Sequence, residues 1–144
     1  MWVPAGASAL RSTKRQRKTK MVTIDHVRAL ASTLPRSYEV YIRKRVKFRV
    51  GQWVYLAFCR DQTEMGFAFP REWRPVAVDA EPHKFFMPTK GDLRYNWLEV
   101  RLAALDEAGM RELVLDAWRM VVPKRVADEY DAASSRPTRM RVTP

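Results

Sequence analysis

Basic side chains recur at every second position of one apolar stretch of the chain. They are Arg43, Arg45, Lys47 and Arg49, and apolar residues separate the last three, as in a strand with one buried face. Side chains two positions apart on a strand are roughly 6.6 Å from each other, because each residue advances the strand by about 3.3 Å. This spacing is close to that of phosphates along one nucleic-acid strand, and Tyr41 would extend the row with a stacking ring. The pattern predicts a ladder of cations that binds backbone phosphates.

An ordinary solvated sheet face is the alternative for the same row. In that interpretation the cations pair with neighbouring carboxylates such as Glu39, Asp61 or Glu64. Lys124 and Arg125 form a second basic group, which either binds phosphates or stands at a helix end whose dipole favours cations. The residue types leave both questions open.

Catalytic and metal-binding patterns are missing from the sequence. It contains no Gly-rich phosphate loop, no nucleophile motif and no paired-cysteine spacing. His26, His83 and Cys59 are its only histidine and cysteine residues, and their separation gives a metal site no support. Cys59 follows an apolar run, so we expect a buried strand thiol. We predict a non-enzymatic protein that needs no metal or cofactor.

The elements that would position the basic row follow from the hydrophobic periods. In chain order they are a helix from 24 to about 34 capped by Thr23, two strands over 38–50 divided by a turn near 43–44, strands over 53–59 and 65–69, a short helix over 71–80, strands over 85–87 and 95–102, and a helix over 106–122. This order predicts an α+β fold with two layers, in which helices pack on one face of an antiparallel sheet of about five strands.

The last strand and the last helix form the unit around which the core is expected. Trp97, Glu99 and Arg101 alternate with apolar residues, after which the period changes to that of an amphipathic helix. Asp106 is suited to cap this helix, and Pro123 should end or kink it, after which residues 124–130 can continue as a helix. We expect its Trp118 in the core, with Trp53, Trp73 and Trp97 in or beside the core and Trp73 the most exposed of the four.

The net charge of +11 is concentrated at the two ends of the chain. Residues 1–20 hold six basic and no acidic residues, and residues 131–144 hold three basic residues against one acid. Neither end has an apolar period, so we expect a disordered basic arm over 1–20, one domain over 21–130 and a disordered basic tail over 131–144. Met21 is a second candidate for the true start.

The compartment follows from what the chain lacks. No run approaches the ~20 apolar residues of a membrane span, and no secretory signal is recognised at the start. The single cysteine fits a reducing compartment. We therefore predict a cytoplasmic protein without a membrane partner.

Three separated blocks resemble the MmcQ/YjbR family of small bacterial proteins. They are Phe48-Arg49-Val50-Gly51, then Trp97-x-x-Val100-x-Leu102, then Asp116-Ala117-Trp118-x-x-Val121-x-Pro123-Lys124-Arg125. The resemblance covers about residues 22–130 and implies a compact two-layer α+β fold, similar to type III secretion chaperones and distantly to frataxin. Family members are usually labelled DNA-binding or of unknown function. An iron site of the frataxin type is not expected, because the first helix offers Asp25 beside Arg28 and no acidic ridge.

Two functions remain open at this stage. The first is a non-enzymatic module that contacts nucleic acid through backbone phosphates, with Tyr41, Arg43, Arg45, Lys47, Arg49, Lys124 and Arg125 as the binding residues. The second is a protein-interaction module, as in the secretion chaperones, without a nucleic-acid role. The sequence indicates neither a target sequence nor an oligomeric state.

Overall fold

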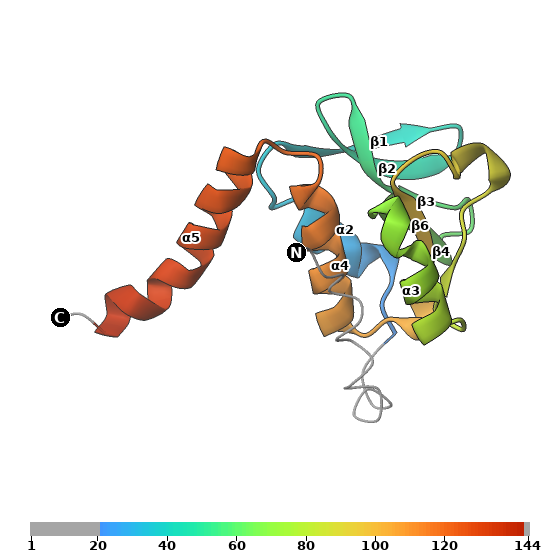
Figure 1. The fold of residues 1–144 in the computed structure, drawn as a ribbon. Coiled ribbons are helices and arrows are strands. Elements are labelled where there is room, and N and C mark those ends of the chain that lie inside the picture. Colours follow the sequence, from blue (N-terminus) through green and yellow to red (C-terminus); the bar gives the residue numbers. More distant parts are fainter. Residues whose placement is uncertain (1–20, 143–144) are drawn as a thin grey trace.

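The computed structural model describes residues 21–142, and their side chains as far as residue 134. The chain folds into one antiparallel sheet with helices against it (Figure 1). In order the elements are α2 (Ile24–Ala31), β1 (Ser37–Ile42), β2 (Arg45–Val50), β3 (Trp53–Phe58), β4 (Glu64–Ala68), α3 (Arg74–Ala80), β5 (Phe85–Phe86), β6 (Trp97–Arg101), α4 (Glu107–Arg119) and α5 (Lys124–Val142). The predicted α+β class and order of elements are confirmed.

The six strands lie in the order β1-β2-β3-β4-β6-β5, and every neighbouring pair is antiparallel. The expected number was about five, and the sheet has six strands because the short strand expected over 85–87 pairs at its edge as β5. Helix α4 packs against β3 and β4, with α2 beside it, so these two helices cover the same face of the sheet (Figure 1). The hydrophobic core fills the space between this face and the helices.

Helix α4 supplies the central core residue. The carboxylate of Asp106 accepts a hydrogen bond from the Gly109 amide at 2.6 Å, which is the predicted cap. Trp118 is fully buried, donates from Nε1 to the Pro35 carbonyl at 2.9 Å, and meets the ring of Tyr130 edge-on at 5.1 Å between centroids. Its predicted place in the core is confirmed.

The expectation for the other tryptophans is partly wrong. Trp53 is 62% exposed, whereas Trp73 is half-buried against the core. The physical reason is position: Trp53 opens β3 directly after the turn at Gly51 and Gln52, and it shares a cavity with Met120 and Val121, which follow the last residue of α4.

The last helix runs further than the sequence indicated. Helix α5 continues to Val142 and so crosses most of the range expected to be a disordered tail. Asp131 anchors its middle by accepting from Arg119 at 2.8 Å, and the alanines that follow favour helix. The expected basic arm, residues 1–20, lies outside the described residues. Within the described part, no helix is long and apolar enough to cross a membrane.

Candidate ligand groove on the open sheet face

A two-residue turn decides which side chains share a face with the basic row. Arg43 and Lys44 form this turn with φ values of 55° and 65°, and the strands on either side pair so that Ile42 faces Arg45. Directly paired residues of antiparallel strands point to the same face. The predicted turn is confirmed, but Arg43 therefore belongs to the turn and is not part of a strand row.

Tyr41 does not extend the row as the alternation suggested. It pairs with Val46, whose side chain is buried on the helix-covered face, so Tyr41 also points to that side of the sheet. Being on the edge strand β1, it remains 69% exposed there. The prediction for Tyr41 is wrong because the turn contains two residues. Across such a turn Ile42 pairs with Arg45 and Tyr41 pairs with Val46, so counting every second residue from β2 into β1 assigns the wrong face.

Three cations of the row do share the other face of the sheet. Arg45, Lys47 and Arg49 alternate along β2 with buried apolar residues and are half-buried. We call the surface to which they point, away from α2 and α4, the open face. The pairing places these open-face neighbours beside them: Tyr38, Val40 and Ile42 of β1, Ala57 of β3, Gly66 of β4, and Trp97 and Glu99 of β6.

Two of the three carboxylates proposed as partners of the row, Glu39 and Asp61, bind other residues. Glu39 binds Arg28 of α2, with Nε–Oε1 at 2.9 Å. Asp61 accepts from the thiol of Cys59 at 2.9 Å and from the hydroxyl of Thr63 at 2.7 Å. Among the described residues, no ion pair within 4.0 Å joins a carboxylate to the three β2 cations.

The β2 cations consequently act on one another. Burial lowers the pKa of Lys47, and the charges of Arg45, Arg49 and Arg43 lower it further, while Asp92 acts in the opposite direction. Arg45 is fixed by a hydrogen bond from Nε to the Phe58 carbonyl at 3.0 Å. An anion placed over this row would relieve the repulsion among its charges.

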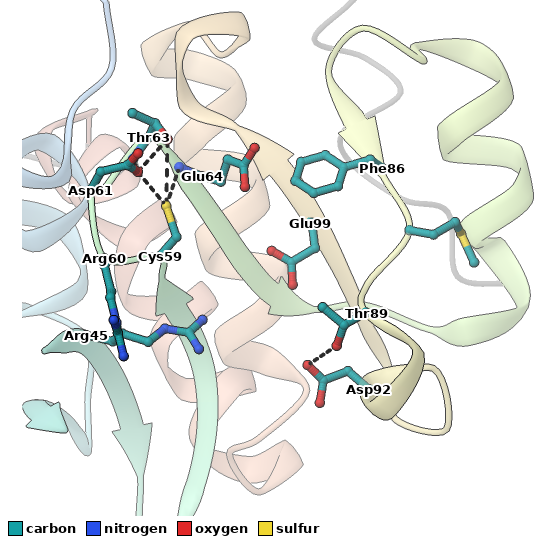
Figure 2. A pocket seen from close by; sticks show the side chains of 11 residues that line it. Arg45, Cys59, Arg60, Asp61, Thr63, Glu64, Phe86, Thr89, Asp92 and Glu99 are labelled. Carbon is teal, nitrogen blue, oxygen red and sulfur yellow. Dashed lines mark hydrogen bonds between the residues drawn. The ribbon is translucent and has the colours of Figure 1, made fainter. Parts of the chain in front are cut away.

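The open face is hollowed into a groove made of two adjoining cavities. The first has a volume of about 620 Å³ and is lined by Cys59, Thr89 and Phe86, among others (Figure 2). The second has a volume of about 680 Å³ and extends beyond the end of the sheet to Trp53 and to Met120 and Val121, which follow α4. Because Arg45, Asp92 and Glu99 line both cavities, we treat them as one groove. Each volume lies in the range of pockets that hold small ligands.

Carboxylates form the wall opposite the cations, and we call Glu64, Asp92 and Glu99 the acidic wall (Figure 2). Burial raises the pKa of Glu99 to about 7, although Trp97, which donates from Nε1 at 3.1 Å, and Arg45 both act to lower it. The charges of the other two carboxylates raise it further. Glu99 can therefore carry a proton near neutral pH.

The floor of the groove depends on one glycine. The indole of Trp97 lies so close over Gly66 that a Cβ built on this glycine would be 2.4 Å from Nε1. Since real Cβ atoms do not approach so closely, Gly66 allows the indole to lie flat in the groove and reach Glu99.

A buried arginine holds the segment that carries Asp92. Arg74 of α3 is 8% exposed and donates to the carbonyls of Leu93, Tyr95 and Trp97 at 2.8 to 3.1 Å. These bonds hold residues 93–97, the segment that joins Asp92 to the start of β6. The wall of the groove is thus set by α3, which the sequence did not associate with a site.

The second basic group lies outside the groove and is paired. Lys124 and Arg125 stand in the first turn of α5, with Asp128 and Glu129 one turn later at 2.9 and 3.6 Å. The structural role expected at a helix C-terminus is wrong, because Pro123 starts a new helix and the dipole disfavours cations at its first turn. The two carboxylates offset that effect.

The histidine and cysteine residues have local roles. His26 accepts a hydrogen bond at Nδ1 from the Thr23 amide at 3.0 Å and so completes the cap of α2. Cys59 is half-buried, beyond the end of β3, and its sulfur accepts from the Glu64 amide at 3.3 Å. The expected buried thiol is therefore partly accessible from the groove.

Comparisons with known proteins find a protein of similar fold and indicate no function. No family model matches the chain, and no curated protein matches its sequence. The crystal structure of Deinococcus radiodurans protein DR2400, whose domain is described as DUF419, is similar with a TM-score of 0.63 and 20% sequence identity. The match covers 76% of this chain and 88% of that one. At this identity the likeness shows a shared fold.

Proposed function

We propose that the protein is a non-enzymatic binding module that holds nucleic acid by its backbone phosphates along Arg45, Lys47 and Arg49. The observation that carries this proposal is that the row has no ion-pair partner: the three cations line up on the open face, and none has a carboxylate within 4.0 Å in the described part of the chain. Arg43, in the adjoining turn, adds to the same field. Phosphate oxygens are suitable acceptors for all four.

We also propose that the chain is a small, cytoplasmic bacterial protein of the MmcQ/YjbR type. The three sequence blocks support this, and DUF419 belongs to the same structural superfamily. Several residues of these blocks have structural roles, as Gly51 does with its φ of 61° and as Trp118 does in the core. The resemblance therefore speaks for the fold more than for a ligand.

A salt series tests the phosphate contacts. Affinity for a labelled oligonucleotide, measured by fluorescence anisotropy, should fall with salt, and Arg45→Ala, Lys47→Ala or Arg49→Ala should each reduce the slope of log affinity against log salt by about one unit. Arg125→Ala is the matched control, since this cation is paired and lies outside the groove. Unchanged slopes in all three groove variants would contradict the proposal.

The six cations of residues 1–20 would attract any polyanion, so the series is repeated on a chain that begins at Met21. Loss of all binding at low salt in that chain would assign the affinity to the N-terminal segment. The basic row would then be only a solvated surface.

A protein-interaction module is the second candidate, and the edge strand β1 favours it. This strand pairs with β2 on one side only among the described strands, and its Tyr38 and Tyr41 are 43% and 69% exposed. A partner segment can pair with such an edge. If the groove variants leave nucleic-acid binding unchanged, this candidate becomes the leading one.

A further inference from the structure

We infer that the nucleic acid bound by this groove is a single strand, with its phosphates on β2 and its bases directed into the groove. The inference rests on the proposed function and specifies its ligand. It is carried by two features that phosphate binding alone does not require: aromatic side chains in the groove and the acidic wall that faces the cations.

Exposed aromatic side chains stand in the half of the groove that contains Lys47. Trp53 is 62% exposed and Tyr95 is 50% exposed, and both line the 680 Å³ cavity together with Trp97. Large aromatic side chains left this accessible around one cavity are suited to stacking. Bases of a single strand can stack on them, whereas bases of a duplex already stack on each other.

The acidic wall makes a second backbone unfavourable. Arg45 lies on one side of the first cavity and Asp92 and Glu99 lie on the other (Figure 2), and all three residues line both cavities of the groove. A duplex lying in the groove would bring one phosphate chain to the cations and the other to these carboxylates. A single strand presents its phosphates to one wall only and avoids this repulsion.

The same carboxylates are suitable partners for base edges. A carboxylate accepts hydrogen bonds from the amino groups of bases, as Glu and Asp do from cytosine. Asp92 accepts a hydrogen bond from the Thr89 hydroxyl at 3.3 Å (Figure 2). Glu99 accepts one from Nε1 of Trp97 at 3.1 Å. The carboxylates that repel phosphates can therefore bind bases that point toward them.

The test compares a labelled single strand of roughly 12 nucleotides, built from dA and dC so that every base carries an amino group, with the duplex that it forms with its complement, using the full chain at matched salt. We expect the single strand to bind at least about tenfold more tightly. Trp53→Ala and Tyr95→Ala should each weaken single-strand binding by about 5- to 150-fold, the loss of one stacked base, while leaving the salt slope unchanged.

Tyr41→Ala is the matched control, because this tyrosine is 69% exposed but, unlike Trp53, lines neither cavity of the groove. It should leave both affinities unchanged. A second readout is the quenching of tryptophan fluorescence by the same single strand, which should decrease in Trp53→Ala.

The outcomes separate this inference from the proposed function. If Arg45→Ala reduces the salt slope but the duplex binds as tightly as the single strand and Trp53→Ala has no effect, the inference is wrong and the phosphate row stands. If Arg45→Ala changes neither slope nor affinity, the proposed function fails and the inference fails with it. An effect of Tyr41→Ala equal to that of Trp53→Ala would also overturn the inference.

Discussion

Gly66 shows how one missing side chain shapes the groove. With a Cβ at this position, the indole of Trp97 would have to move, because the nearest indole atom would be 2.4 Å away. We expect Gly66→Ala to destabilise the fold by about 1–3 kcal/mol, the usual cost of overpacking, and to break the hydrogen bond from Trp97 to Glu99.

Urea unfolding gives the free-energy change, and near-ultraviolet circular dichroism reports the indole environment. Gly91→Ala is the control, since a Cβ there meets nothing within 4 Å. Equal stabilities of the two variants would show that the indole moves aside at no cost.

Glu99 links the stability of the fold to pH. The folded chain keeps a proton on Glu99 up to about pH 7, whereas the unfolded chain releases it near the ordinary value of 4.5. Between these values the folded state binds more protons, so the contribution of this carboxyl to the unfolding free energy falls as pH rises. Arg45 on β2 limits the effect, while Glu64 on β4 and Asp92 enhance it.

We expect Glu99→Gln to remove this part of the pH dependence. The measurement is urea unfolding of the wild type and the variant over a pH series that spans the two pKa values. Glu72→Gln, which changes an exposed carboxylate of the short turn before α3, should leave the dependence as in the wild type. Parallel curves for wild type and Glu99→Gln would contradict the raised pKa.

At the scale of elements, α3 acts as a support for the groove. It contributes one buried cation, Arg74, whose two terminal nitrogens bind three backbone carbonyls of residues 93–97. Carbonyls that lose a charged donor in a buried place cost roughly 1–3 kcal/mol each. The segment that carries Asp92 and Tyr95 therefore depends on a helix that does not line the groove itself.

Arg74→Ala should loosen this segment before it unfolds the domain. Trypsin cleaves after Lys90 and Arg94, and we expect cleavage there to become at least about tenfold faster, corresponding to roughly 1.4 kcal/mol of easier opening. Mass spectrometry of the fragments identifies the sites. Arg111→Ala, an exposed change on α4, is the control, and equal cleavage in both variants would show that Arg74 does not hold the segment.

At the scale of the whole molecule, the core lies entirely between Val22 and Ala127. Tyr130 still packs on Trp118, and Asp131 still binds Arg119. We therefore expect a fragment of residues 21–134 to melt cooperatively, within a few degrees of the full chain. Calorimetry of the two proteins measures this, and a broad or strongly lowered transition would show that an end of the chain belongs to the core.

Most of the elements could be predicted because their signals are local. The cap at Asp106, the turn at Arg43 and Lys44, and the apolar stripe that buries Trp118 each depend on residues within about one or two turns of each other. The end of α5 was missed, since no apolar period marks it and its anchor is an ion pair formed across two helices.

The groove could be predicted only in part, because alternation describes one strand at a time. It correctly placed Arg45, Lys47 and Arg49 together, but it could not show that the two-residue turn sends Tyr41 to the opposite face. Alternation also assigned Glu99 to the polar face of its own strand. It could not indicate that the strand order β2-β3-β4-β6 brings Glu99 into the same cavity as Arg45. The period of a strand is a local property of the backbone, whereas the pairing of strands is settled by contacts between distant parts of the chain.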